Sequence, residues 1–316
     1  MKPRCFVGID TSNYTTSAAI CTEAGEIVAN LKKPLPVKEG ECGLRQSDAV
    51  FSHVRNLPIL MQELRGELCG YDVLAVGCSV KPREAEGSYM PCFLAGQAAA
   101  EAFAAPLGLP VYGFSHQDGH IMAALYSSGA AECLLASPFA AFHVSGGTTE
   151  VLYVTPRSDG FDICLIGETE DLNAGQVIDR VGVSMGLQFP CGKEMEALAG
   201  GFDGKLPRPR ICVRDGNCNL SGLQNLAEKM WRETGDVARV SAYVFAFVGE
   251  TLRAMTAAID EKYPKLPVLY AGGVMSNRRI QAMLSARENT YFAEPQFSAD
   301  NAAGTALLCR KRFLNL

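Results

Sequence analysis

Two stretches of this chain, about half its length apart, repeat one pattern of strand, polar turn and strand. The first covers residues 5–21, and its turn at 11–16 is rich in hydroxyl groups. The second covers residues 139–154, and its turn at 145–149 reads Ser-Gly-Gly-Thr-Thr. Short apolar runs bounded by turn residues are typical of buried strands. A repeated unit of this kind predicts two duplicated halves that face each other, with a ligand between them.

The second turn exposes its backbone, because Gly146 and Gly147 carry no side chains. Successive uncovered N–H groups can wrap an anion such as phosphate, although an ordinary hairpin turn is the simpler alternative. A third element, residues 268–277, is an apolar strand that breaks at a glycine pair before a helix predicted to begin near Ser276. Helix N-termini after glycine turns also bind anions, so this element is another candidate anion site.

Ser115 and Asp118 predict the start of a helix on which His116 and His120 lie one turn apart. Two imidazoles at this spacing commonly bind a divalent transition metal, whereas two surface histidines are the alternative. The chain has four histidines, so finding half of them at this spacing favours metal ligation. A third ligand, a carboxylate, has to come from elsewhere in the chain. Asp300 stands at the predicted start of the last helix, where it is either a helix cap or such a ligand.

The composition is that of a globular protein of about two domains, with 316 residues, 48% hydrophobic and 20% charged. The sequence offers no uninterrupted apolar stretch long enough for a membrane span and no signal peptide, so we expect a cytoplasmic protein that does not contact the membrane. The 12 cysteines form no C-x-x-C pair, and in a reducing compartment we expect most of them to be small core residues.

The net charge of −5 argues against strong unaided binding to nucleic acid. Basic residues nevertheless gather at 205–214, at Arg278-Arg279 and at 310–312, where a solvated surface is the simpler interpretation. Any RNA contact is therefore expected to be local, made either by this chain alone or together with a protein partner.

Several further elements follow from spacing. Apolar residues at helical spacing over 47–68 predict a long helix bent at Pro58, on which His53 is expected to be a surface or packing residue. Residues 200–218 are rich in Gly, Pro and basic residues, which predicts a mobile loop. Asp236 is expected to cap another long amphipathic helix.

Taken together, eight segments resemble the motif series of the tRNA threonylcarbamoyladenosine synthase family, formerly called O-sialoglycoprotein endopeptidase. The segments, in chain order, are GIDTSNYTTSAAI, HQDGH, HVSGGTTE, GETEDLNAGQVIDR, GKEMEALA, NLSGL, YAGGVMSNRR and SADNAAG. The resemblance implies the α/β fold of actin, sugar kinases and heat-shock ATPases, two-lobed with duplicated halves and a cleft for nucleotide and metal. We expect an N-terminal lobe at 1–115 and a C-terminal lobe at 116–316, whose last helix, about 300–316, packs back on the first lobe.

The resemblance also implies site residues. His116, His120 and Asp300 match the family's metal ligands, usually for iron or zinc, with magnesium as an alternative cation. The positions that match the loop for the phosphate and acyl part of an acyl-adenylate are His143, Val144, Ser145, Gly146 and Gly147. The positions that match those for the adenosine part are Asp179, Gly192, Glu196 and Asn277. In the first turn, Asp10 and Ser12 are the expected catalytic residues.

The implied reaction transfers a threonylcarbamoyl group from its adenylate to the exocyclic amine of the adenosine 3′ of the tRNA anticodon, releasing AMP. The implied partners are tRNA, bound through local basic patches, and helper proteins.

The chain departs from the family pattern at several positions. Tyr14 and Thr15 stand where the family has an acidic pair, Thr148 replaces a histidine, residues 81–83 replace a Gly-Pro-Gly turn, and Asp10 replaces a glutamate. These departures predict a divergent member that takes a related carbamoyl group or another acceptor. Two alternatives stay open, a nucleotide-binding scaffold without turnover and, because Asp10 resembles the magnesium-organising Asp of sugar kinases, a kinase or ATPase of the same fold.

Overall fold

The computed structural model describes residues 2–12, 14–36, 44–298 and 300–316, so Asn13 of the first predicted turn and Ala299 of the last motif lie outside the described residues. The chain forms two compact units. Unit 1 consists of Met1–Gly129, Pro156–Asp162 and Gln296–Leu316, and unit 2 consists of Ala130–Thr155 and Ile163–Pro295. This division differs from the expected boundary after residue 115, because the helix that carries His116 and His120 packs within unit 1 against the last helix of the chain.

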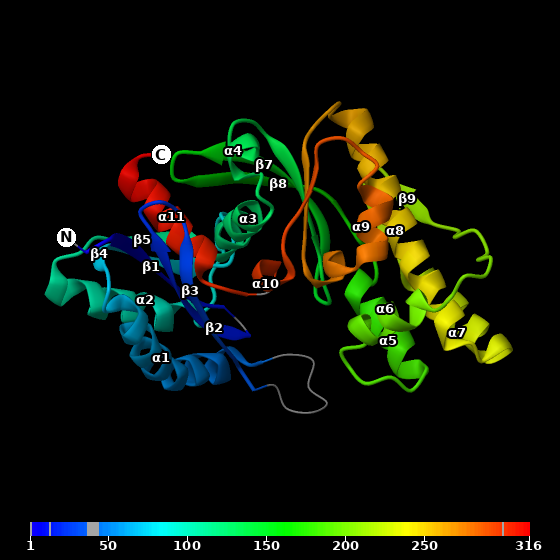
Figure 1. Ribbon diagram of the computed structural model, residues 1–316, viewed down its shortest axis with the longest axis horizontal. Coiled ribbons are helices and arrows are strands. Elements are labelled where there is room, and N and C mark those ends of the chain that lie inside the picture. The colour runs from blue at the N-terminus through cyan, green and yellow to red at the C-terminus, as the bar shows by residue number, and fades with distance from the viewer. Residues whose placement is uncertain (1, 13, 37–43, 299) are drawn as a thin grey trace. The chain divides into compact units, whose positions relative to one another are not determined.

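The two large sheets have the same plan, which confirms the duplication read from the sequence (Figure 1). The first has the order β3-β2-β1-β4-β5, and the second has the order β12-β11-β6-β7-β8. In each, the central strand, β1 or β6, pairs antiparallel with its hairpin partner and parallel with the strand on its other side. The strands of the first sheet are β1 Arg4–Thr11, β2 Thr15–Thr22, β3 Ile27–Pro34, β4 Asp72–Lys81 and β5 Val111–Ser115. Those of the second are β6 Phe139–Val144, β7 Thr149–Arg157, β8 Gly160–Glu168, β11 Val268–Ala271 and β12 Thr290–Phe292.

Helices cover both faces of the first sheet, which is why β1 is buried from Cys5 to Thr11. The helices of this region are α1 Gln46–Leu68, α2 Phe93–Ala104, η1 Ala105–Leu107, α3 His116–Ser127, α10 Pro295–Ser298 and α11 Ala303–Leu314. Side chains of α1 and α2 pack on the face that carries Val7 and Ile9 of β1. The opposite face is covered by α11, whose Phe313 packs on Phe6 (Figure 1).

The helix α11 approaches both the sheet and α3 unusually closely. A Cβ atom on Gly304 would lie 1.8 Å from the carbonyl oxygen of Gly119 in α3, and one on Gly8 would lie 2.5 Å from the carbonyl oxygen of Ala302. Only glycine leaves room for backbone against backbone at these crossings. The segment before α11, which carries Asp300, is thereby held beside the start of α3.

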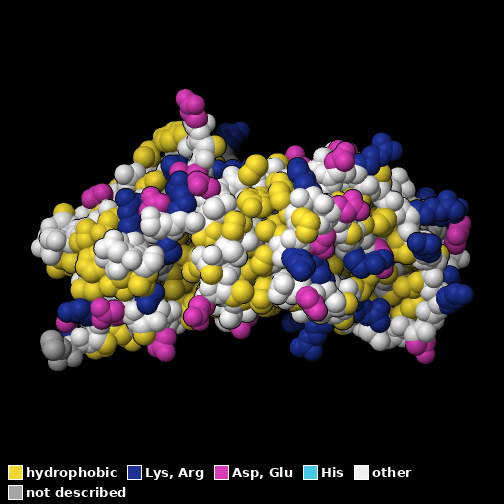
Figure 2. Space-filling view, turned by 90° about the horizontal axis from the view of Figure 1, so that it is seen from above, with side chains coloured by type: hydrophobic (Ala, Val, Ile, Leu, Met, Phe, Trp, Pro, Cys, Tyr) yellow, Lys and Arg dark blue, Asp and Glu magenta, His cyan; other side chains and the backbone are white. Residues whose placement is uncertain are grey.

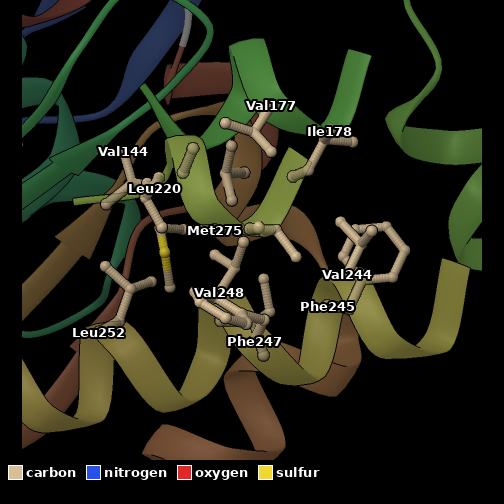
Figure 3. Packing of buried hydrophobic residues seen from close by; sticks show 14 of the residues in the cluster. Val144, Val177, Ile178, Leu220, Val244, Phe245, Phe247, Val248, Leu252 and Met275 are labelled. Atoms are coloured by element: carbon tan, nitrogen blue, oxygen red, sulfur yellow. The ribbon is translucent and has the colours of Figure 1, made fainter. Parts of the chain in front are cut away.

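Unit 2 is built around one long helix, α8. Its elements outside the sheet are α4 Ala131–Leu134, α5 Ala174–Ser184, α6 Gly192–Gly200, β9 Cys212–Arg214, β10 Asn217–Asn219, α7 Ser221–Thr234, α8 Val237–Lys262, η2 Gly273–Ser276 and α9 Arg278–Leu284. Figure 3 shows Val244, Phe247 and Leu252 of α8 pointing into a cluster that includes Val144 of β6 and Met275 of η2. Among the described residues only α8 has the length and hydropathy of a membrane span, but 67% of its most apolar window is buried, as expected for a core helix.

Most of the predicted elements are present; the differences concern the predicted mobile loop, the start of α9 and the position of His53. Asp236 caps α8 as expected, accepting a hydrogen bond from the Arg239 amide at 2.9 Å. The end of the predicted mobile loop instead forms the β9–β10 hairpin. After the glycine pair, the 3-10 turn η2 comes first, and α9 begins at Arg278 with Asn277 as its cap. His53 is fully buried, so the surface alternative for this residue was wrong.

We predict that Gly304→Ala destabilises the protein by about 1–3 kcal/mol, because the methyl group forces α11 away from α3. The matched control is Gly222→Ala in α7, where an added Cβ meets nothing within 4 Å. Denaturant unfolding of both variants measures the difference. A Gly304→Ala protein as stable as the control would contradict the close contact.

Candidate metal and nucleotide sites

The two histidines of α3 and Asp300 lie close together in unit 1. Ser115 caps α3, since its hydroxyl accepts a hydrogen bond from the Asp118 amide at 3.1 Å, and this sets the first turn of the helix. The Nε2 atoms of His116 and His120 are 2.9 Å apart. The Oδ1 atom of Asp300 lies 3.3 Å from His120 Nε2 and 3.6 Å from His116 Nε2. Asp300 does not cap α11, whose cap residue is Ala302.

A buried carboxylate on β1 supports this cluster from behind. Asp10 is fully buried, and its Oδ1 lies 2.9 Å from His116 Nδ1. Because an ionised carboxylate can only accept, Nδ1 of His116 carries the hydrogen of this bond, and its Nε2 faces His120 and Asp300. A carboxylate that holds one ring nitrogen while the other faces a metal is the usual support of a metal-binding histidine.

The charges around His116 favour a cation at this place. Burial by itself would lower the pKa of His116, but the neighbouring carboxylates, Asp10 first and then Asp300, raise this pKa to about 10. Burial would likewise raise the pKa values of both carboxyls, but His116 lowers that of Asp10, and His116 with His120 lowers that of Asp300. Two carboxylates therefore compensate positive charge at the imidazoles, and a metal ion could supply that charge.

The donor set fits a divalent transition metal. One ligand atom from each of His116, His120 and Asp300 lies within 4.8 Å of the others, and the three residues are half-buried. Two imidazole nitrogens and one carboxylate oxygen are ligands that zinc and iron(II) accept, with further coordination positions left open for substrate. Imidazole nitrogen makes magnesium a poorer fit.

The tip of the second hairpin is organised by its own serine. The Ser145 amide donates to the Thr148 carbonyl at 2.7 Å, and the amides of Gly147 and Thr148 donate to Ser145 Oγ at 3.3 and 3.1 Å. Gly146 and Gly147 are exposed, and an added Cβ on either would meet nothing within 4 Å. The tip is therefore open, but an incoming anion has to displace the Ser145 hydroxyl to reach these two amides.

Val144 and His143, which precede this tip, differ in the groups that a ligand can reach. Val144 is fully buried in the core of unit 2, so only its backbone is available to a ligand. His143 is half-buried and lies opposite the buried Glu150 of β7 in the strand register. Residues opposite each other in an antiparallel pair project to the same face, so Glu150 shares a face with His143. The sequence pattern alone did not single out Glu150.

The residues expected around adenosine lie in the middle of α5, along α6 and at the start of α9. Asp179 of α5 accepts a hydrogen bond from the Cys191 amide at 2.8 Å, directly before Gly192 begins α6, and burial raises the pKa of Asp179. One turn further along α6, Glu196 accepts the Arg278 amide at 2.7 Å.

Asn277, beside Arg278, accepts the Ile280 amide at 3.0 Å. Its buried Nδ2 has no hydrogen-bond partner among the described residues. A buried unpaired donor is costly, so Asn277 is a candidate contact for a ligand acceptor.

Asp171 joins the turn before α5 to the start of α7. Its carboxylate accepts hydrogen bonds from the Leu220 and Ser221 amides at 2.7 and 3.1 Å. Burial would raise its pKa, but hydrogen bonds from Ser221, Leu220 and Leu172 lower this pKa from 3.8 to about 2. The charged form is thus the one that the folded state favours.

We predict that Asp171→Asn lowers the melting temperature at pH 7, because the amide loses the charge that strengthens these bonds. A pKa depressed in the folded state stabilises the fold above the ordinary pKa of 3.8, and this stabilisation is lost as pH falls towards about 2. The difference in melting temperature between the two proteins should therefore shrink as pH falls through this window. A difference that is the same from pH 7 down to the acid limit would contradict this role.

Solved structures with the same architecture define the class of fold. The chain superimposes on full-length HypF in a phosphate- and nucleotide-bound form with a TM-score of 0.60 at 12% identity, covering 98% of this chain and 47% of that one. It superimposes on the activator of 2-hydroxyisocaproyl-CoA dehydratase from Clostridium difficile with a TM-score of 0.53 at 12% identity, covering 97% and 94%. A ROK family glucokinase from Streptomyces griseus gives a TM-score of 0.50 at 14% identity, covering 97% and 99%. The α/β fold of actin, sugar kinases and heat-shock ATPases is therefore confirmed.

The sequence comparisons identify the family. Residues 49–307 match the family model described as tRNA N6-adenosine threonylcarbamoyltransferase, TsaD. A protein of that name from Streptococcus suis is 31% identical over 297 residues, which are 90% of this chain and 84% of the relative. One from Streptococcus pneumoniae is 30% identical over 298 residues, with the same coverage. The chain belongs to this family, and the resemblance read from the eight motifs is confirmed.

Proposed function

We propose that this protein is a metal-dependent transferase that moves a threonylcarbamoyl group, or a closely related carbamoyl group, from its adenylate to an adenosine of tRNA and releases AMP. The observation that carries the proposal is the convergence of His116, His120 and Asp300, backed by Asp10, in a member of this family. A tRNA substrate agrees with the expected cytoplasmic location.

Unit 1 holds the cation in this proposal. His116 and His120 would ligate it through Nε2, and Asp300 would ligate it through a carboxylate oxygen. Asp10 fixes the imidazole of His116 by accepting its Nδ1 hydrogen. When bound, a divalent cation would supply Lewis acidity to an oxygen atom of the substrate.

Unit 2 holds the nucleotide. The phosphate replaces the Ser145 hydroxyl as the acceptor of the Gly147 and Thr148 amides. Asp179 and Asn277 contact the adenosine part. The exocyclic amine of tRNA adenosine attacks the carbamoyl carbon and forms a new C–N bond. The bond between this carbon and the phosphate oxygen of AMP breaks, and the amine loses one proton. Such a reaction gains mainly from holding the two reactants in place.

The RNA contact is expected to be local. On the part of the described surface seen in Figure 2, Lys and Arg side chains are interspersed with acidic and hydrophobic ones and form no continuous basic area. Lys205, Arg208, Arg210 and Arg214 are all exposed around the β9–β10 hairpin of unit 2. They are our candidates for phosphate contacts, with a helper protein supplying further ones.

The first test offers the purified chain synthetic threonylcarbamoyl-adenylate and unmodified tRNA, with and without a lysate of its source as a supply of partner proteins. We expect the modified nucleoside, detected by mass spectrometry after digestion, and one AMP per modification. The Streptococcus suis relative serves as the positive control. Absence of product from this chain, under conditions in which the relative forms it, would overturn the proposal.

The same samples separate the two alternatives. AMP binding measured by calorimetry without any turnover would indicate a nucleotide-binding scaffold. Phosphate release from ATP that is lost in Asp10→Ala would indicate a kinase or ATPase.

We also predict that Asp10→Asn weakens binding of Zn²⁺ about 10–100-fold, because loss of the supporting carboxylate frees the His116 ring to rotate and to change tautomer. His116→Ala should weaken binding further, since it removes a ligand. Competition with a chromophoric chelator measures both without any need for activity. Asp48→Asn, at an exposed position of α1, is the control. Unchanged Zn²⁺ affinity in Asp10→Asn would contradict the supporting role.

A further inference from the structure

His53 of α1 lies under the first turn and contacts both of its ends. This histidine is fully buried. Its Nε2 lies 2.8 Å from the carbonyl oxygen of Ser12, at the end of β1, and its Nδ1 lies 2.9 Å from the hydroxyl of Thr16, on β2. One rigid ring thus joins the residue that enters the turn to the strand that leaves it. Neither the metal cluster nor the nucleotide residues include His53.

The direction of every hydrogen bond in this group follows from its chemistry. A carbonyl oxygen can only accept, so Nε2 of His53 carries a hydrogen. In the neutral ring Nδ1 is then the acceptor, and the Thr16 hydroxyl donates to it. The same hydroxyl oxygen accepts from the side-chain amide of Asn56 at 3.1 Å. Burial, the largest influence, lowers the pKa of His53, in agreement with a neutral ring.

The second hairpin has an equivalent arrangement made from different groups. The last register pairs are Thr11 with Thr16 and Val144 with Thr149, so both turns have four residues and begin at Ser12 and Ser145.

In the second hairpin the first two amides of α5 make the equivalent contacts. The Gly175 amide donates to the carbonyl oxygen of Ser145 at 3.0 Å, and the Ala174 amide donates to the hydroxyl of Thr149 at 2.9 Å. His53 therefore contacts the same two atoms of the first turn that the N-terminus of α5 contacts in the second.

We infer that His53 is a positioning residue that fixes the first turn for substrate, as the start of α5 fixes the second. The residue through which it acts is Ser12, whose carbonyl it binds and whose buried Oγ has no hydrogen-bond partner among the described residues. A buried hydroxyl without a partner is costly, so Ser12, two residues after Asp10, is a candidate contact for an oxygen acceptor of the substrate. This inference rests on the proposed function for the identity of that substrate.

The test compares three variants. His53→Leu keeps an apolar side chain of similar size and removes both bonds, and His53→Gln retains an N–H donor for the Ser12 carbonyl. Leu64→Ala, at another buried position of α1, lowers stability without touching the turn. All are studied well below their melting temperatures.

Amide hydrogen exchange gives the readout that does not depend on activity. We expect peptides covering residues 14–18 to exchange at least tenfold faster in His53→Leu, those covering 145–150 to be unchanged, and His53→Gln to recover part of the protection. Leu64→Ala should leave the first turn protected. Equal exchange of the first turn in His53→Leu and Leu64→Ala would overturn the positioning role.

Transfer kinetics give the second readout. We expect kcat to fall at least tenfold in His53→Leu while the affinity of the protein for AMP stays within twofold, and His53→Gln to recover part of kcat. A kcat in His53→Leu equal to that of Leu64→Ala would overturn the inference. If the unaltered protein transfers nothing, the proposed function fails, and the exchange measurement alone decides whether His53 fixes the turn.

Discussion

The close contact of α11 with α3 and with the first sheet is the constraint on which the unit 1 site depends. Gly304 lets the backbone of α11 meet the Gly119 carbonyl of α3 where any side chain would collide, and Gly8 lets the start of α11 lie directly on β1. Asp300 belongs to the segment that enters this helix. It reaches His116 and His120 only because the helix lies so close to α3. A candidate metal-binding set whose histidines and aspartate are about 180 residues apart in sequence thus depends on the absence of a few methyl groups.

A charged carboxylate that is buried beside α3 needs a positive partner, and the histidines of α3 supply it. Asp10 is fully buried and would be costly as an unpaired anion, yet His116 beside it and the lowered pKa keep it charged. The imidazole of His116 links the two carboxylates, since its Nδ1 binds Asp10 and its Nε2 faces Asp300. Asp10 therefore orients the imidazole of His116.

The two hairpins show how a duplicated unit has diverged. Each places a serine at the start of a four-residue turn and a threonine at the start of the returning strand. The second is held by helix amides, whose partial positive charge suits an anion. The first is held by a neutral imidazole and carries Tyr14 and Thr15 without a carboxylate of its own. The carboxylate that precedes this turn is that of Asp10, which lies against His116.

Residue spacing was enough to predict the elements and their local chemistry: both hairpins, the capped helix with two histidines one turn apart, and the Asp236 cap. These depend on residue spacing and on hydrogen bonds within one turn, which short-range pattern records. Packing between distant segments sets which groups meet. Asp10 binds His116, and Asp300 faces the histidines instead of capping α11. Val144 lies in the core, and His53 is buried under the first turn. These partners are far apart in sequence, and the packing of helices and sheets brings them together. A local sequence pattern contains no information on that packing.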